Sequence, residues 1–181
     1  MTHTVAPIVE GHGDVAALRV LLGKIAPAIR VARPVRFPKS KLVKVETELV
    51  RAVRIAGANI RPGETGLILL LIDGDEDCPA KLAPELLASM NKGARDIHCL
   101  VVFAVREFES WIVGGHPDLD IADPEHAGKA KGRIEKINGG LYQQSVDQAR
   151  LASRIEVDRL RPHSPSFRRF AERIENFVNK P

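Results

Sequence analysis

One uninterrupted apolar run most constrains how this chain can fold. Residues 66–72 read Gly-Leu-Ile-Leu-Leu-Leu-Ile and are followed by Asp73. A strand without polar alternation is buried on both faces, and such strands are typical of parallel sheets that helices cover on both sides. His98–Val105 is a second run of this kind, and Thr4–Val9 is a shorter, β-branched one. The three runs predict the inner strands of one parallel sheet.

Helical patterns fill the intervals between these runs. A weak pattern broken by Pro34 predicts an edge strand over Ile29–Phe37. The expected helices are Asp14–Ile29 (ending near Pro27), Leu42–Ala56, Pro79–Asn91 and one that begins at Phe108. Strands that alternate with helices predict an α/β fold with a mostly parallel sheet covered by helices.

The last third of the chain reads differently. A loop rich in Gly, Pro and Asp covers residues 114–124, and helical segments follow near 126–138, 147–160 and 166–178. We therefore expect a single domain over residues 1–181, with an α/β core at 1–113 and a helical C-terminal extension at 114–181. At 181 residues the chain is long enough for a sizeable core.

The net charge of +4 conceals an uneven distribution. Residues 1–62 carry a net charge of +7, residues 63–126 carry −9, and residues 127–181 carry +6. An acidic centre between basic flanks suits a protein that holds divalent cations and faces a polyanion. Acidic residues that are merely solvated would give the same count, and charge alone does not separate these two interpretations.

Several classes of protein are excluded by simple counts. The two cysteines, Cys78 and Cys99, are too few for a disulfide scaffold or a Cys-rich zinc site. No apolar run approaches the ~18 residues of a membrane span, and the first residues lack a signal-peptide pattern. We expect a cytoplasmic protein with no membrane association.

Acidic side chains follow each of the three predicted inner strands. Glu10 follows the first strand, Asp73 and Asp75 follow the strongest, and Glu107 and Glu109 come after the third. In open α/β sheets ligands bind beyond the carboxyl ends of the strands. If the sheet is parallel, these carboxylates meet at one edge, where their repulsion costs stability unless cations neutralise them.

The kind of ligand predicts the kind of metal. Carboxylate oxygens without a thiolate or histidine cluster favour Mg²⁺ or Mn²⁺ over Zn²⁺. The alternative is a solvated acidic loop. Glu107 and Glu109 lie two residues apart and cannot share a helical face, so one of them can be a ligand while the other caps a helix start.

Glu-Gly after a first strand and Asp-x-Asp after a later one resemble the Toprim domain, the metal-binding module of topoisomerases, primases and several nucleases. The resemblance covers Ile8–Asp14 and Leu69–Asp77. It implies a Toprim-like Rossmannoid sheet with Glu10 as general acid or base and metal neighbour. It also implies that the metal ligands are Asp73, Asp75, and either Glu76 or Asp77. In the overcoming-lysogenization-defect nucleases a further acidic residue lies four positions after the Glu, which corresponds to Asp14.

The remainder of the chain resembles a small stand-alone Toprim-like family, a domain of unknown function whose members often sit beside a gene for an ATPase. The residues that carry this resemblance are Glu107 to Trp111, the helix 127–137 with Lys129 and Lys131, Tyr142, and Ser164 to Phe167. The resemblance implies metal-dependent phosphodiester chemistry on nucleic acid, as in a nuclease, with an ATPase as partner. Lys129 or Lys131 is the candidate to balance transition-state charge; the alternative is an ordinary surface helix.

Three basic residues are candidates for contact with nucleic acid. His12 lies in the first strand-to-helix loop, and Arg168 and Arg169 follow Ser166, which is also an ordinary helix N-cap. The chain has no G-x-x-x-x-G-K-[ST] sequence, which disfavours ATP hydrolysis. The main alternative to a nuclease is a non-catalytic, metal- or nucleic-acid-binding regulatory subunit of an ATPase complex.

Overall fold

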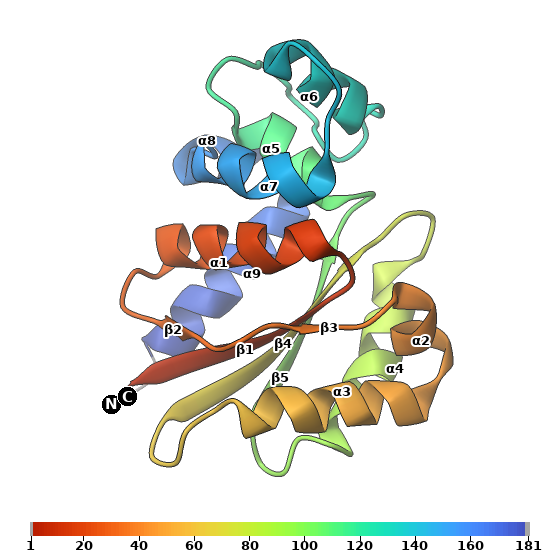
Figure 1. The fold of residues 1–181 in the computed structure, drawn as a ribbon, viewed down its shortest axis with the longest axis vertical. Helices are drawn as coiled ribbons and strands as arrows, with labels where there is room; N and C mark the ends of the chain where they lie inside the picture. Colours follow the sequence, from red (N-terminus) through yellow and green to blue (C-terminus); the bar gives the residue numbers. More distant parts are fainter. Residues whose placement is uncertain (1, 180–181) are drawn as a thin grey trace.

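The computed structural model describes residues 2–179 and arranges five parallel strands in one sheet between two layers of helices (Figure 1). The strand order is β2-β1-β4-β5, and β3 pairs with β1 further along the same side as β2. The strands are β1 (His3–Val9), β2 (Arg30–Val31), β3 (Val35–Arg36), β4 (Thr65–Asp73) and β5 (His98–Ala104). The helices are α1 (His12–Ile25), α2 (Lys39–Lys44), α3 (Glu46–Ala58), α4 (Pro79–Asn91), α5 (Phe108–Gly115), α6 (Ala130–Asn138), α7 (Gln144–Ser153), α8 (Val157–His163) and α9 (Pro165–Val178).

Strand β4 lies at the centre and is buried on both faces, which confirms the α/β fold with a mostly parallel, helix-covered sheet. Leu67, Leu69 and Leu71 pack into a core shared with α1, α5 and α9. The alternate residues Ile68, Leu70 and Ile72 pack into a second core shared with α3 and α4. A two-residue period therefore supplies both cores from one apolar run.

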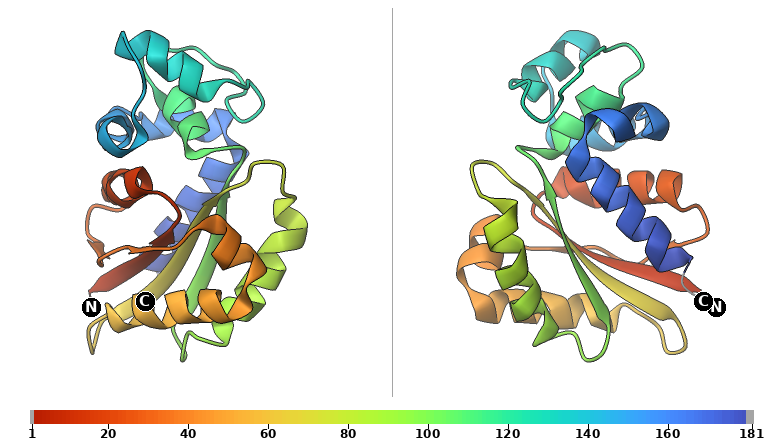
Figure 2. Two further views of the ribbon diagram at one scale, coloured as in Figure 1. Left: turned by 45° about the vertical axis from the view of Figure 1, so that its right-hand side comes forward. Right: turned by 180° about the vertical axis from the view of Figure 1, so that it is seen from behind.

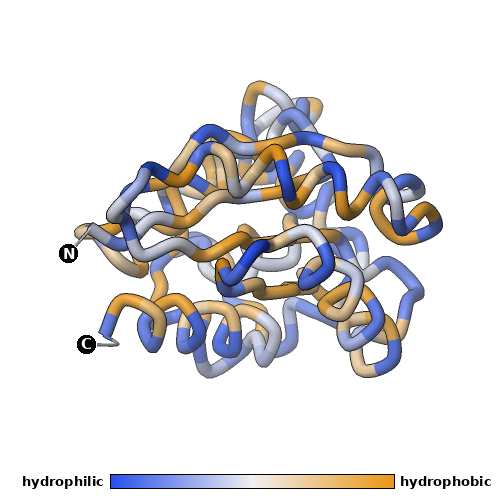
Figure 3. The backbone as a smooth tube through the Cα atoms, turned by 90° about the horizontal axis from the view of Figure 1, so that it is seen from below, coloured by the Kyte–Doolittle hydropathy of each residue, from blue (hydrophilic) through white to orange (hydrophobic). Residues whose placement is uncertain are grey.

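The helices after β5 cover the carboxyl edge of the sheet and one of its faces. Helices α5 to α8 lie beyond the strand ends, and α9 then runs back across the face that α1 also covers (Figures 1 and 2). Figure 3 shows α9 with its hydrophobic residues turned toward the rest of the molecule. These residues include Phe167, Phe170 and Ile174, which are fully buried. The expected helical C-terminal extension therefore packs against the α/β core. None of the described helices is long and apolar enough to span a membrane.

Four predicted elements differ in detail from the structure. The expected edge strand over residues 29–37 is two short strands, β2 and β3, because Pro34 lies between them. The expected helix 42–56 is divided at Val45 into α2 and α3, and the expected helix 147–160 is divided into α7 and α8. Helix α6 begins at Ala130 rather than near 126, because Gly128 and Lys129 have positive φ angles of 59° and 52° that interrupt a right-handed helix.

Candidate functional site

The acidic side chains that follow β1 and β4 meet at the carboxyl edge of the sheet. The parallel register pairs Ile8 with Leu70, so the two strands end side by side. The Asp73 backbone amide donates a hydrogen bond of 2.7 Å to Oε1 of Glu10. Glu10 is thus held against the end of the neighbouring strand, as the strand-end pattern predicted.

Asp73 lies at the centre of this edge. Its Oδ1 accepts a 2.8 Å hydrogen bond from the backbone amide of Phe108, the first residue of α5. Burial, together with the negative charges of Asp14, Glu109 and Glu10, raises the pKa of Asp73 to about 8. A carboxyl group with this pKa needs either a proton or a nearby cation near neutral pH.

The same causes act on Glu10. Burial raises its pKa, and the charges of Asp14 and Asp75 act in the same direction, while the Asp73 amide and Lys39 oppose the rise. Four carboxylates therefore interact with one another, and we call Glu10, Asp14, Asp73 and Glu109 the carboxylate cluster.

Asp14 is fixed by groups from two helices. Its Oδ2 accepts from the backbone amide of Gly11 at 2.8 Å, and its Oδ1 accepts from Nε2 of Gln148, on α7, at 3.0 Å. Helix α7 reaches Asp14 because Gly13 lets it approach closely: a Cβ at Gly13 would lie 2.1 Å from Oε1 of Gln148. The C-terminal helices are therefore part of the site.

Glu109 is fully buried, and neither of its carboxylate oxygens has a hydrogen-bond partner among the described residues. Burial raises its pKa, although Lys131 opposes the rise. The Tyr142 hydroxyl lies close to this carboxylate, yet it also completes no hydrogen bond, and neither does Oε1 of Gln148. An ionised carboxylate left in this state is costly, so Glu109 needs either a proton or a nearby cation.

Lys39 lies beside the carboxylate cluster and forms ion pairs with Asp75 and Asp77. Its Nζ donates to the backbone oxygen of Asp73 at 2.7 Å and lies 2.6 Å from Oδ2 of Asp75 and 2.9 Å from Oδ2 of Asp77. Burial lowers the pKa of Lys39, but its hydrogen bonds to both carboxylates outweigh that effect and raise it. The ammonium group thus stays charged and offsets part of the negative charge of the two exposed aspartates. Sequence reasoning missed Lys39 because it lies 34 residues or more before its partners.

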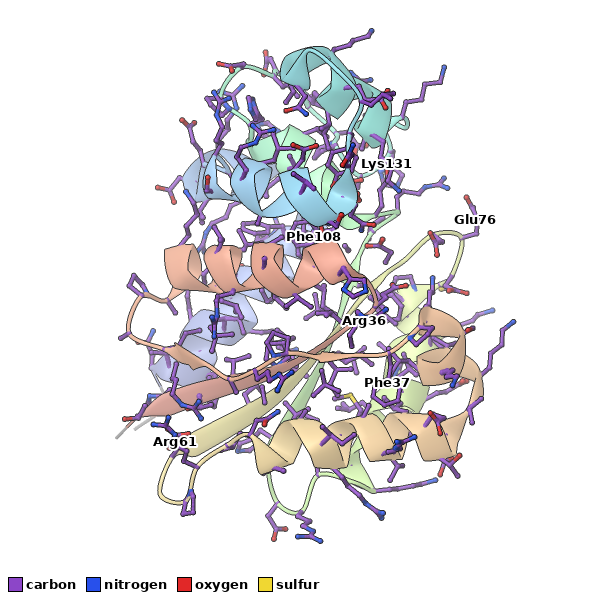
Figure 4. The ribbon with its side chains drawn as sticks, in the orientation of Figure 1. Arg36, Phe37, Arg61, Glu76, Phe108 and Lys131 are labelled. Atoms are coloured by element: carbon purple, nitrogen blue, oxygen red, sulfur yellow. The ribbon has the colours of Figure 1, made fainter. Side chains whose placement is uncertain are left out.

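Glu107 and Glu109 have different surroundings. Glu107 lies at the N-cap of α5 but makes no side-chain capping bond; its Oε2 lies 2.9 Å from Nζ of Lys131. Burial lowers the pKa of Lys131, and the contact with Glu107 outweighs this and raises it. Both lysines are exposed; Lys131 pairs with Glu107 from α6 (Figure 4), whereas Lys129, the N-cap of that helix, makes no ion pair with a described residue.

A cavity of about 500 Å³ lies between the loop after β4 and the start of α6, and no member of the carboxylate cluster lines it. Asp75, Glu107 and Lys129 line it, as do Glu76 and Arg106, which form an ion pair with each other. Figure 4 shows Glu76 on the loop after β4 and Lys131 on α6. The cavity therefore reaches Asp75 and Glu107, each two residues from a member of the cluster.

The three candidate nucleic-acid contacts lie in two places. His12 is exposed at the first position of α1, two residues from Glu10. Arg168 and Arg169 are exposed on α9, and Arg169 lines a groove of about 530 Å³ between α4, β5 and α9. No member of the carboxylate cluster lines that groove. His12 therefore lies beside Glu10 along the chain without a side-chain contact to the cluster among the described residues, and the two arginines lie outside the site.

The carboxylate side chains of the cluster are the type of ligand that a hard cation prefers, but their arrangement does not form a complete coordination site. Within residues 2–179, no three His, Cys, Asp or Glu side chains are arranged around a common point as a bound metal ion requires. The fit rests instead on the orphaned oxygens of Glu109 and on the repulsion at Asp73, both of which a Mg²⁺ or Mn²⁺ ion would relieve. Asp14 would have to exchange one of its present hydrogen bonds for the ion.

A family model described as a domain of unknown function, DUF4276, matches residues 9–175. The match spans both the strands and the C-terminal helices that form the site. No curated protein and no solved structure has a significant match to the chain.

Proposed function

The chain belongs to the DUF4276 family, and from its site we propose that it hydrolyses phosphodiester bonds in nucleic acid with the aid of Mg²⁺ or Mn²⁺. The observation that carries the proposal is the buried carboxylate cluster, in which Glu109 has two oxygens without partners. Such a cluster is costly to keep ionised unless it binds cations, and perturbed carboxyl groups of this kind are frequent at functional sites. The basic flanks of the sequence supply the complementary charge for a polyanionic substrate.

A relationship to the Toprim domain is part of this proposal. This part of the proposal is supported by the position of Glu10 directly after β1 and of Asp73 at the end of the neighbouring strand β4. Asp14, in the first turn of α1, lies close enough to Asp73 for its charge to raise the pKa of Asp73. A cytoplasmic location and an ATPase partner belong to the same proposal and await test.

Each residue then has a defined task. Asp73, Glu109 and Asp14 would hold the metal, which lowers the pKa of bound water and stabilises the leaving oxygen when present. Glu10 accepts the Asp73 amide through Oε1 and keeps Oε2 without a partner among the described residues, so Oε2 can accept a proton from the attacking water. Lys131 lies where a cation can balance the added charge of the transition state.

The Glu10→Gln variant tests this function. Purified protein is incubated with supercoiled DNA, single-stranded DNA and RNA in the presence of Mg²⁺, Mn²⁺ or EDTA, and products are resolved on gels. We expect metal-dependent cleavage by the wild-type protein and a loss of about 10²–10⁴-fold in rate for the variant, since the proton acceptor is removed.

Glu85→Gln is the matched control, because Glu85 is exposed on α4. Cleavage that survives in Glu10→Gln at the control rate contradicts the proposed role of Glu10. If no substrate is cut under any condition, the proposed hydrolysis fails and the non-catalytic alternative takes its place; the ion pairs of Lys39 with Asp75 and Asp77, which occupy two candidate metal ligands, support that alternative.

Lys39→Met tests whether the resident ammonium competes with a metal ion. Removing a positive charge beside the cluster should tighten Mn²⁺ binding by roughly 3–10-fold, in line with about 1 kcal/mol for one partly screened charge. Binding is measured calorimetrically without substrate. Lys41→Met, on the exposed side of the same helix, is the control and should leave the affinity unchanged. Weaker Mn²⁺ binding in Lys39→Met would mean that Lys39 organises the site rather than competing for it.

A further inference from the structure

The segment at residues 33–44 is the most uniformly basic part of the chain. It contains Arg33, Arg36, Lys39, Lys41 and Lys44 and no acidic residue. It forms β3, the connection that follows it and the helix α2. We call residues 33–44 the basic segment.

The sheet register places the basic segment directly beside the carboxylate cluster. Arg36 pairs with Val9, the residue before Glu10, and the Phe37 amide donates to the Val9 carbonyl at 3.0 Å. Neighbouring residues in paired strands project from the same face of a sheet. Val9 packs into the core beneath α1, so Arg36 extends on that same face, toward the start of α1 (Figure 4).

Most charges of the basic segment are not balanced within the protein. Lys39 is paired with Asp75 and Asp77. Arg36, Lys41 and Lys44 are exposed, and none of the three side chains makes an ion pair or a side-chain hydrogen bond with another described residue. Lys41 and Lys44 lie three positions apart on α2, so they are neighbours on the helix surface. The basic segment thus carries three solvated cations, of which Arg36 lies nearest to Glu10 through its pairing with Val9.

A second group of cations lies across the site. Lys129 is exposed at the start of α6, and Lys131 approaches Glu107 from the same helix. Figure 4 shows Lys131 and Arg36 on separate elements, above and below the level at which α1 begins. The negative cluster therefore has positive charge on both sides, which suits an anion that continues past the site in both directions.

We infer that the basic segment binds the phosphate backbone of a nucleic acid as it passes the carboxylate cluster. The inference rests on the proposed function for its choice of partner, and a polyanion is favoured because regularly spaced phosphates release counterions when cations bind them. An isolated acidic side chain on a partner protein could pair with only one of these basic residues, whereas a phosphate backbone can pair with several. Arg168 and Arg169 lie outside this path.

The test is binding without a metal ion, so that it is independent of cleavage. Fluorescence anisotropy in EDTA follows labelled single-stranded DNA, duplex DNA and RNA of one sequence over a range of salt concentrations. The triple variant Arg36→Gln, Lys41→Gln, Lys44→Gln should bind at least about 30-fold more weakly at 0.1 M salt. Its salt slope should fall by about 2 to 3, because each lost phosphate contact removes close to one counterion.

Arg54→Gln, Arg61→Gln, Arg95→Gln is the matched triple, since these three arginines are exposed and the change in net charge is the same. Arg61, at the opposite end of the sheet from Arg36 in Figure 4, shows the separation. The control should bind within about twofold of the wild-type protein. Equal weakening in both triples overturns the inference, as does a wild-type protein that binds no oligonucleotide.

Vesicles containing phosphatidylserine provide the third arm. Binding to vesicles but to no oligonucleotide would assign the basic segment to a membrane surface and overturn the inference. Metal-free binding that depends on the basic segment, combined with no cleavage, would leave this inference standing while the proposed hydrolysis fails. If the triple variant cleaves nucleic acid as fast as the wild-type protein, the inference about the basic segment fails while the proposed hydrolysis stands.

Discussion

At pH 8 and without a metal ion, the Asp73→Asn variant is expected to be more stable than the wild-type protein, and it is expected to have no nuclease activity. An unfolded aspartate ionises near pH 4, whereas burial and three neighbouring carboxylates raise the pKa of Asp73 to about 8 in the folded protein. Between these values the unfolded state binds fewer protons, so the free energy of unfolding falls as pH rises from about 4 to about 8. The full contribution is on the order of 5 kcal/mol.

Asparagine removes this ionisation and can still accept the hydrogen bond from the Phe108 amide. Urea denaturation in EDTA at pH 5 and pH 8 measures the effect, with Asp158→Asn, on the exposed surface of α8, as the control. Adding Mg²⁺ at pH 8 should stabilise the wild-type protein and not the variant. A variant that is less stable than the wild-type protein at pH 8 would show that Asp73 is a structural residue, and the proposed metal site would lose its central ligand.

Trp111→Ala is expected to lower the free energy of unfolding by about 3–5 kcal/mol. Trp111 is fully buried and stacks on Phe170, with ring centroids 5.4 Å apart and an interplanar angle of 8°. It also contacts Phe108 and Phe167, and its Nε1 donates to Oγ of Ser166 at 2.8 Å. The indole therefore joins α5, which carries Glu109, to α9, and its removal leaves a large cavity between them.

Trp111→Phe separates packing from hydrogen bonding. It keeps most of the aromatic contacts and leaves the buried Ser166 hydroxyl without its donor, so a smaller loss of about 1–3 kcal/mol is expected. Urea denaturation monitored by circular dichroism measures both variants. A cost below about 1 kcal/mol for Trp111→Ala would mean that α9 does not depend on this contact.

The inner strands of the sheet could be predicted because the signal for each lies within a few consecutive residues. Residues 66–72 are apolar without interruption, and only burial on both faces explains such a strand. Once the sheet is parallel, the carboxyl ends of β1 and β4 share an edge, and the contact between Glu10 and Asp73 follows. The edge strand was harder, since β2 and β3 have two residues each and leave almost no pattern.

The surroundings of the site could not be predicted in the same way. Gln148 reaches Asp14 across 134 positions, and Lys39 reaches Asp75 across 36. Neither contact follows from periodicity, because each depends on how one helix docks beside another. The close approach required at Gly13 was the one available signal, and a glycine alone has too many explanations to reveal a docked helix.

The roles of Glu107 and Glu109 show the limit of helical geometry. The sequence correctly predicts that two residues at this spacing face different ways. The structure buries Glu109 and leaves Glu107 partly exposed beside Lys131. Which of the two turns inward depends on α6 and α7, which come later in the chain.

The close packing of α1 against α7 has a consequence for any attempt to isolate the working part of this molecule. Gly13 and Asp14 are covered by Gln144 and Gln148, and Tyr142 adjoins Glu109. A fragment cut after α5 would keep all four acidic groups and lose the walls that desolvate them. The smallest transplantable unit of the site is therefore not the parallel sheet with its strand-end acids, but that sheet together with the helices through α7.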